Sequence, residues 1–111
     1  MNDIKYKIDP KEIFDLIIIG NITKDYLNNC SDFQLGGPSL YAGIAASKLG
    51  LKTLIISNHT LNKNYFDNFP LLNILNISTK SDTEFSINYI NNQRKLELKN
   101  KAPKIELNLN N

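Results

Sequence analysis

The sequence predicts an α/β fold with a mostly parallel sheet, and two observations in its first half carry this prediction. Residues 14–20 form a continuous apolar run that ends at Gly20, which is typical of a strand buried on both faces of a sheet. A run of small residues over 39–49 and a second apolar run over 52–57 follow. The order strand, helix, strand predicts a βαβ unit with a right-handed crossover.

The helix expected over residues 39–49 has clear signals at both ends. Pro38 suits the first helical position, where its missing N–H costs nothing, and Gly50 is a natural C-terminal cap. Alanine and glycine dominate the residues between them, so the helix carries little side-chain bulk. We therefore expect it to lie very close to the sheet.

The second half of the chain predicts smaller elements. Apolar residues spaced as on a helix face predict a helix over residues 61–69, and residues 72–78 predict a short strand. Two alternating stretches flank Asn91-Asn92, and asparagine tolerates the left-handed backbone of a tight turn. These stretches predict a β-hairpin that either covers a pocket or forms a plain sheet edge, whereas residues 21–25 are expected to form a polar loop.

Composition excludes several classes of function. A chain of 111 residues with a net charge of +2 is one domain in length, and it has no basic stripe of the kind that binds nucleic acid. The longest apolar run is too short to span a membrane, and the first eleven residues do not resemble a signal peptide. The single cysteine and single histidine, Cys30 and His59, predict neither a disulfide framework nor a metal site. We expect a cytoplasmic protein with an arm over residues 1–13, a folded domain over 14–105 and a tail over 106–111.

Two features lie where an open α/β sheet binds its ligand, beyond the carboxyl ends of its strands. Asp25 follows the first predicted strand by five residues, and an ionised carboxylate there can accept hydrogen bonds from two hydroxyl groups of a polyol. From the residues alone, a solvated loop aspartate is the commoner role. Gly36-Gly37 precedes the helix, where paired glycines let a ligand approach free backbone N–H groups, although an ordinary capped turn has the same signature. The glycine spacing matches neither a P-loop nor a dinucleotide fingerprint.

Taken in order, these elements resemble the ribokinase-like (PfkB) carbohydrate kinases. That family opens with a strand, a G-x-I-x-x-D element, a glycine pair and a small-residue helix ending in Leu-Gly; this sequence has them from Asp15 to Gly50. The strand pair after Thr83 and the segment at Pro103 also resemble the family. The resemblance covers residues 14–105 but only about the first third of a typical member. It implies the N-terminal part of a Rossmann-like three-layer fold with a small β hairpin or lid extension.

The resemblance also implies roles for individual residues. Asp25 would bind substrate hydroxyls, the Gly36-Gly37 backbone would line the sugar with Asn21 nearby, and Phe85 would pack against the substrate. Tyr41 stands where many members use an asparagine on the sugar. The stretch between Asp25 and Gly36 is shorter than the lid of ribokinase itself, which implies a branch with little lid.

The expected function is therefore the substrate-binding part of an ATP-dependent sugar or nucleoside kinase. Family members transfer the γ-phosphoryl group of ATP, with Mg²⁺, to an alcohol. The G-A-G-D segment that supplies their base and anion hole is absent from these 111 residues, so we expect no catalytic residue, no cofactor bound by the chain alone and no turnover. Two alternatives remain: a non-catalytic module that pairs with itself or with a separate C-terminal piece, and an unrelated Rossmann-like nucleotide binder.

Overall fold

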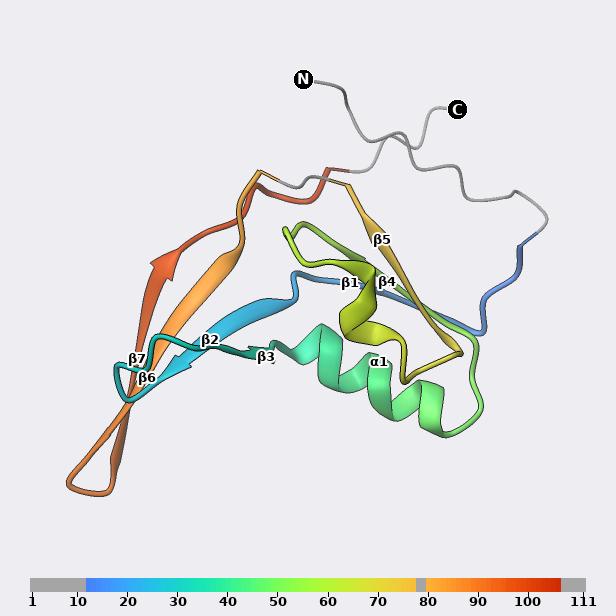
Figure 1. The fold of residues 1–111 in the computed structure, drawn as a ribbon. Coiled ribbons are helices and arrows are strands. Elements are labelled where there is room, and N and C mark those ends of the chain that lie inside the picture. Colours follow the sequence, from blue (N-terminus) through green and yellow to red (C-terminus); the bar gives the residue numbers. More distant parts are fainter. Residues whose placement is uncertain (1–11, 78–79, 107–111) are drawn as a thin grey trace.

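The computed structural model describes residues 12–77 and 80–106, which form two sheets, one α-helix and one short 3₁₀ helix (Figure 1). Most of the expected arm and tail therefore lies outside the described residues. The first sheet has the order β1-β4-β5 and the second the order β3-β2-β6-β7. The elements are β1 (Leu16–Ile19), β2 (Thr23–Leu27), β3 (Gln34–Gly36), α1 (Pro38–Lys48), β4 (Thr53–Ser57), η1 (Lys63–Phe66), β5 (Leu72–Asn76), β6 (Thr83–Ile90) and β7 (Gln93–Asn100).

The first sheet is parallel, as the sequence predicts. β4 pairs in parallel with β1 on one side and with β5 on the other, and all five of its residues are buried. Helix α1 connects β3 to β4 and packs along this sheet (Figure 1). The α/β fold with a mainly parallel first sheet is confirmed.

Helix α1 begins and ends as its signals predict. Pro38 is its first residue, and Gly50, just beyond the end, has a left-handed φ of 92°. The helix lies very close to the sheet at Gly43, where a Cβ atom would be 3.0 Å from Ile55 Cγ1. Any larger residue at position 43 would push the helix away from β4.

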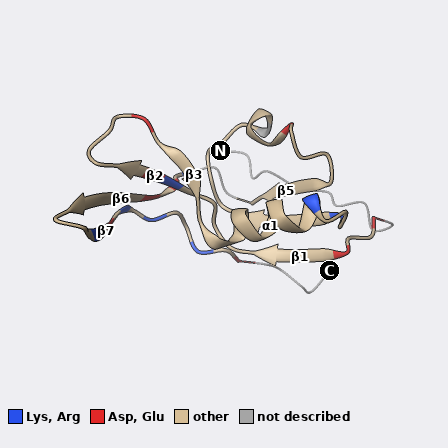
Figure 2. Ribbon diagram, turned by 90° about the horizontal axis from the view of Figure 1, so that it is seen from below, with Lys and Arg blue, Asp and Glu red and all other residues tan. Residues whose placement is uncertain are grey.

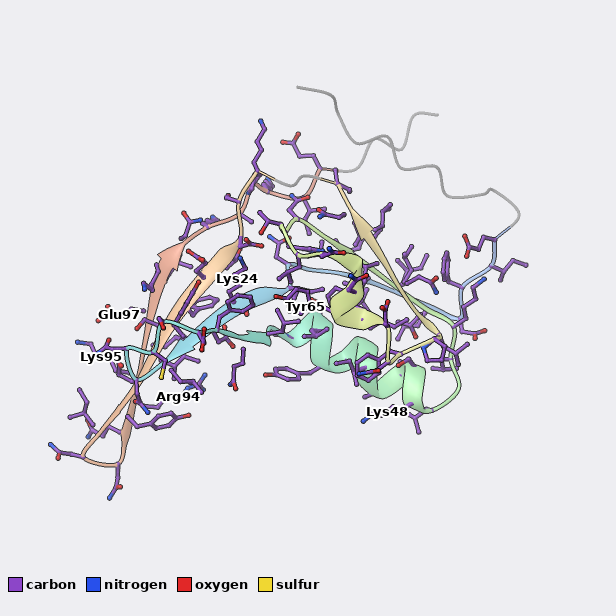
Figure 3. All side chains as sticks on the ribbon, in the orientation of Figure 1. Lys24, Lys48, Tyr65, Arg94, Lys95 and Glu97 are labelled. Atoms are coloured by element: carbon purple, nitrogen blue, oxygen red, sulfur yellow. The ribbon has the colours of Figure 1, made fainter. Side chains whose placement is uncertain are left out.

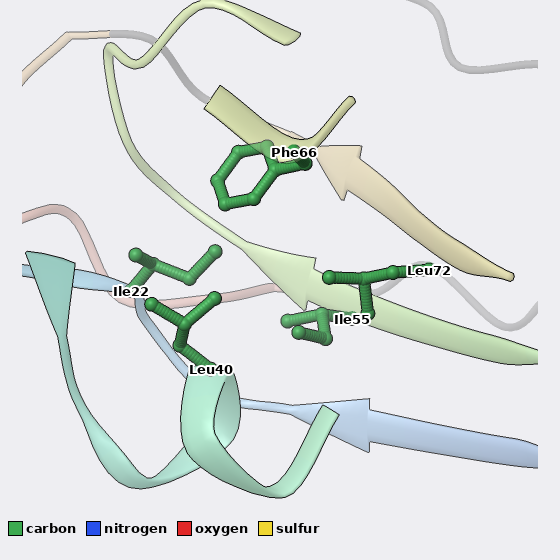
Figure 4. Packing of buried hydrophobic residues seen from close by; sticks show 5 residues of the cluster. All are labelled: Ile22, Leu40, Ile55, Phe66 and Leu72. Atoms are coloured by element: carbon green, nitrogen blue, oxygen red, sulfur yellow. The ribbon is translucent and has the colours of Figure 1, made fainter. Parts of the chain in front are cut away.

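The main core lies between α1, η1 and the first sheet. Figure 4 shows five of its side chains, which come from four elements and the segment before β2: Ile22, Leu40, Ile55, Phe66 and Leu72. A smaller cluster centres on Leu54, Ile56 and Leu75 of β4 and β5. The core thus fixes the start of β2 and the start of α1 against the same sheet.

The second sheet is larger than the expected hairpin. β6 and β7 form that hairpin, and Asn91 and Asn92 adopt φ angles of 51° and 64° in its turn, which confirms the turn prediction. β2 adds to β6 in parallel, and β3 adds to β2 antiparallel. Residues 23–36 thus supply two further strands, and the second sheet has four strands rather than the two of the expected hairpin.

Three local expectations are wrong. Residues 21–25 are not a polar loop, because Thr23–Leu27 is strand β2. The helix expected over residues 61–69 is reduced to the 3₁₀ turn η1. Strand β1 forms as expected, but it is not buried on both faces: Ile17 and Ile19 are 55% and 57% exposed, because no helix among the described residues covers their face of the sheet, which is opposite α1.

Charges are scattered over the described part of the molecule. Figure 2 shows basic and acidic residues on the second sheet and at the ends of the first, without one face dominated by a single sign. No helix in the described ranges is long and apolar enough to cross a membrane.

Candidate polyol-binding groove

An open groove of about 810 Å³ lies between one face of the second sheet and the start of α1. Its size falls within the range of ordinary small-molecule sites. It is lined by Thr23, Asp25, Leu27, Gln34, Gly37, Pro38, Tyr41, Phe85, Ile87, Tyr89, Arg94 and Leu96. Three of the predicted site side chains, those of Asp25, Tyr41 and Phe85, therefore lie on one cavity.

The alternation of β2 directs the carboxylate of Asp25 into the groove. Thr23, Asp25 and Leu27 line the groove, whereas Lys24 and Tyr26 between them face the other side of the sheet. The Thr23 hydroxyl donates a hydrogen bond of 2.8 Å to Asp25 Oδ1. Within the described residues Asp25 Oδ2 accepts no hydrogen bond, so this oxygen can accept one from a ligand.

The glycine pair lies directly beside this carboxylate. A Cβ atom at Gly36 would overlap Asp25 Oδ2 and lie 2.8 Å from Asp25 Cγ. Gly37, with a left-handed φ of 97°, lines the groove at the start of α1. Asp25 and the glycine pair thus share one crevice, as the sequence predicts, and a side chain at position 36 would displace the carboxylate.

Asn21 and Gly36 do not line the groove. Asn21 Oδ1 instead accepts a hydrogen bond of 2.7 Å from the backbone N–H of Asn58, which ties the segment after β1 to the end of β4. Gly36 is buried behind the Asp25 carboxylate. Both residues therefore hold the groove in place, whereas Gly37 and Tyr41 are at its surface.

Eight of the twelve residues that line the groove were not predicted from the sequence as site residues. The residues not predicted are Thr23, Leu27, Gln34, Pro38, Ile87, Tyr89, Arg94 and Leu96. The alternation in the predicted hairpin contains a signal for three of them, because Ile87 and Tyr89 share a face with Phe85, and Leu96 pairs with Ile87. Leu27 and Gln34 carry no such signal, since the strands that position them were not predicted.

No protein-family model matches the sequence, and no curated protein is significantly similar to it. Solved structures do match. A pyrophosphate-dependent kinase in the ribokinase family, in complex with sulfate, is 19% identical with a TM-score of 0.65 over 82% of this chain and 35% of its own. An uncharacterised sugar kinase from Pyrococcus horikoshii is 13% identical with a TM-score of 0.56 over 78% of this chain and 34% of its own. The chain has a ribokinase-like fold.

A third match concerns a bound polyol. It is a pyrophosphate-dependent kinase in the ribokinase family complexed with a pyrophosphate analogue and myo-inositol, 20% identical with a TM-score of 0.62 over 82% of this chain and 34% of its own. This chain therefore spans about a third of the length of the structures that it matches. The likeness establishes the ribokinase-like fold, with its two sheets, for that third.

An ion pair within the second sheet of this ribokinase-like fold is hydrogen-bonded to Thr60, the residue that links it to the first sheet. Lys24 Nζ lies 3.0 Å from Asp82 Oδ2, and both side chains are largely buried. Burial alone would raise the pKa of Asp82, but hydrogen bonds from the Thr60 hydroxyl and N–H, together with Lys24, outweigh it and lower this pKa. Because Thr60 follows β4 and Lys24 belongs to β2, the three residues fix the tilt of the second sheet over the first.

His59 stabilises the same junction as a neutral group. Its Nδ1 lies 2.8 Å from Ser57 Oγ, which accepts a hydrogen bond of 2.9 Å from the backbone N–H of Ile22. Asn76 pairs with the backbone of His59 in both directions, through its side-chain oxygen and nitrogen. Burial lowers the pKa of His59, and the Asp82 charge opposes this only in part. His59 is therefore a structural residue here.

The described residues offer no obvious metal centre. No three His, Cys, Asp or Glu side chains gather there in a way that would hold a metal ion. The groove itself has one carboxylate, Asp25, and one guanidinium, Arg94. Figure 3 shows Arg94 and Lys95 on the second sheet, away from α1.

Proposed function

We propose that this chain binds a sugar or nucleoside through its hydroxyl groups, as the substrate-binding part of a kinase that phosphorylates an alcohol. One observation carries the proposal. Asp25 lines a groove, beside Gly37 at the start of α1, and its Oδ2 has no hydrogen-bond partner among the described residues. A carboxylate can accept two hydrogen bonds from adjacent hydroxyl groups, each contributing about 1.5–3 kcal/mol.

The other groove residues supply orientation. Phe85 is the β6 partner of Asp25, so a sugar ring held by the carboxylate would lie over the Phe85 side chain. Thr23 holds Asp25 Oδ1 and leaves Oδ2 without a hydrogen-bond partner among the described residues. The missing side chain at Gly37 allows the ring to approach the helix start closely. The bound myo-inositol of a structural neighbour supports a polyol as the ligand class.

The groove does not account for how a phosphoryl donor would be bound. The family resemblance implies ATP and Mg²⁺, which would supply the transferred group and neutralise its charge. A Mg²⁺ site needs carboxylate and phosphate oxygens together, and the groove offers one carboxylate that is already turned toward the substrate. The described residues therefore do not fit an ATP–Mg²⁺ site, and we expect the chain by itself to bind substrate without turnover.

The test is a titration with myo-inositol and D-ribose, followed by calorimetry. We expect Asp25→Asn to weaken binding about 10- to 100-fold, since a hydrogen bond to a charged acceptor is lost. Asp67→Asn changes an exposed carboxylate outside the groove and should leave the affinity unchanged. Equal affinities for Asp25→Asn and the unchanged protein would rule out this site.

A second function, that of an assembly module, is favoured by the surface of β1. Among the described residues β1 has a free edge, and Ile17 and Ile19 are more than half exposed. An unpaired apolar strand is a template for pairing with a second copy or a separate chain. Light scattering tests this proposal: association that Ile17→Lys abolishes would support it, and a monodisperse monomer would contradict it.

A further inference from the structure

The start of β2 is fastened to the first sheet by a buried hydrogen bond from its backbone. The Ile22 N–H donates to Ser57 Oγ at 2.9 Å, although the two residues are 35 positions apart in the chain. Both residues are fully buried. Because Ser57 is the last residue of β4, this bond holds the start of the strand that carries Asp25 against the central strand of the first sheet.

The Ser57 hydroxyl also has a partner on its other side. Its Oγ lies 2.8 Å from Nδ1 of His59, a residue that is 2% exposed. A serine hydroxyl has a single proton to donate, and an unprotonated ring nitrogen is an acceptor. The three groups therefore form a chain of hydrogen bonds with one direction while the ring is neutral: the Ile22 N–H donates to Ser57, and the Ser57 O–H donates to His59.

A proton on His59 would disrupt this chain of hydrogen bonds. Nδ1 would become a donor, so the Ser57 hydroxyl would lose its acceptor in a fully buried site. Leaving a buried hydroxyl without a partner is unfavourable, and so is placing a positive charge on a buried ring. Protonation therefore favours conformations in which these groups are opened to water.

The groups packed around His59 offer little compensation for a positive charge. Phe66 of η1 lies edge-on to the ring, with the two centroids 6.4 Å apart, and Asn76 of β5 bonds to the His59 backbone. Among the described residues, the charged group that acts on the ring is Asp82, which favours the protonated form and is itself paired with Lys24. Burial outweighs Asp82 and lowers the pKa of His59 below its usual 6.5.

We propose that His59 acts as a proton-sensitive latch: its protonation favours an open state in which Ile22 separates from Ser57 and the start of β2 leaves the first sheet. In that state the ring and the Ser57 hydroxyl both gain water as a partner. The first sheet itself is retained, because β1, β4 and β5 are held by their own pairing and by packing with α1. The inference is independent of the proposed function, since no ligand takes part in the opening.

The experiment is amide hydrogen exchange of the complete 111-residue chain, followed by NMR at several pH values between 5 and 7.5. Rates are expressed as protection factors, which correct for the direct effect of pH on exchange. We expect Ile22 to be less protected than Ile55 in β4, and its protection to fall about tenfold from pH 7.5 to pH 5, because the open state binds one more proton. Leu49, whose N–H bonds to Ala45 at the end of α1, should keep a constant protection factor, since this helix end opens without exposing His59.

Two results would overturn the latch. Protection of Ile22 that does not change with pH would show that the His59 ring is not linked to this opening. Equal protection of Ile22 and Ile55 at every pH would mean that Ile22 exchanges only when the whole chain unfolds, so that no separate open state exists.

Three variants locate the latch. His59→Gln keeps a hydrogen-bonding side chain that does not titrate, so the difference in Ile22 protection between pH 5 and pH 7.5 should disappear. Ser57→Ala removes the acceptor and should leave Ile22 weakly protected at both pH values. Ser47→Ala is the control, because it also removes a buried hydroxyl, one that donates to the Ile44 carbonyl within α1, and it should leave Ile22 unchanged. Full protection of Ile22 in Ser57→Ala would contradict the proposal, whether or not His59→Gln folds.

Discussion

The carboxylate of Asp25 occupies the space in which a side chain at Gly36 would begin. A Cβ atom there would overlap Asp25 Oδ2, and Thr23 Oγ1 lies 3.1 Å from the same position. Neither neighbour can give way freely, since Thr23 and Asp25 are hydrogen-bonded to each other. The residue at position 36 therefore controls where the carboxylate lies.

Gly36→Ala is accordingly expected to reduce myo-inositol affinity about tenfold, measured by calorimetry, and to cost about 1–3 kcal/mol of stability through overpacking. Gly50→Ala is the control. Gly50 has a φ of 92° and open space around it, so alanine there should cost about 1–2 kcal/mol of stability through backbone strain alone. The idea fails if Gly36→Ala binds the ligand normally or if Gly50→Ala weakens binding equally.

The Lys24–Asp82 ion pair should contribute measurably to stability. Lys24→Met leaves a largely buried carboxylate with hydrogen bonds from Thr60 only, and we expect a loss of about 1–3 kcal/mol in the free energy of unfolding by urea. Lys95→Met removes an exposed ion pair and should cost less than about 0.5 kcal/mol. Indistinguishable losses would mean that the Lys24–Asp82 pair has no special role.

The lowered pKa of His59 should make the stability of the folded chain depend on pH. Burial holds its pKa below the usual 6.5 in the folded chain, so the unfolded chain takes up a proton first as the pH falls. Stability should therefore fall from about pH 7 toward pH 5. Asp82 acts in a separate window, because its lowered pKa contributes stability that is lost only below about pH 3.8.

Urea unfolding at a series of pH values between 5 and 7.5 measures the His59 effect. His59→Gln should remove most of the slope in this window, whatever its effect on absolute stability, because the chain contains one histidine. An NMR titration of the His59 ring in the folded protein should give a midpoint below 6.5. A midpoint above that value would contradict the buried neutral state.

The hairpin turn offers a stabilising substitution. Asn92 has a φ of 64°, a conformation that glycine adopts without steric cost. Asn92→Gly should raise stability by about 0.5 kcal/mol, seen as an increase of about 2–4 °C in Tm by circular dichroism. Asn88→Gly, within β6, should lower Tm instead, since glycine weakens a strand interior. A decrease for both variants would indicate a different turn.

The elements that could be predicted from the sequence are those with strong local signals. Pro38 and Gly50 mark α1, Asn91-Asn92 marks the hairpin turn, and β4 has an apolar centre because both of its faces are covered. Such signals depend on residues close together in the chain. They suffice for the α/β fold and for the expectation that Asp25 and the glycine pair meet.

The missed features depend on contacts between distant residues. β2 reads as a loop because its groove face carries Thr23 and Asp25, the polar residues that the candidate site requires, in place of the apolar residues of a typical strand. The apolar run of β1 predicts burial on both faces, but such a run does not reveal whether another element covers each face. Asn21, which the family resemblance implies near the substrate, accepts a hydrogen bond from Asn58 with its side chain and does not line the groove.

The pairing of β2 with β6 has a consequence for how the groove forms. Thr23 pairs with Thr83, more than half the chain away, whereas the two strands of the β6–β7 hairpin are adjacent. Strands that are close in the sequence pair quickly, and strands that are distant in the sequence pair slowly. We therefore expect the β6–β7 hairpin to form first and β2, which carries Asp25, to pair with β6 late. In refolding experiments, recovery of ligand binding should then lag behind the appearance of β-structure. A ribosome-bound chain would gain its groove only after β6 had emerged.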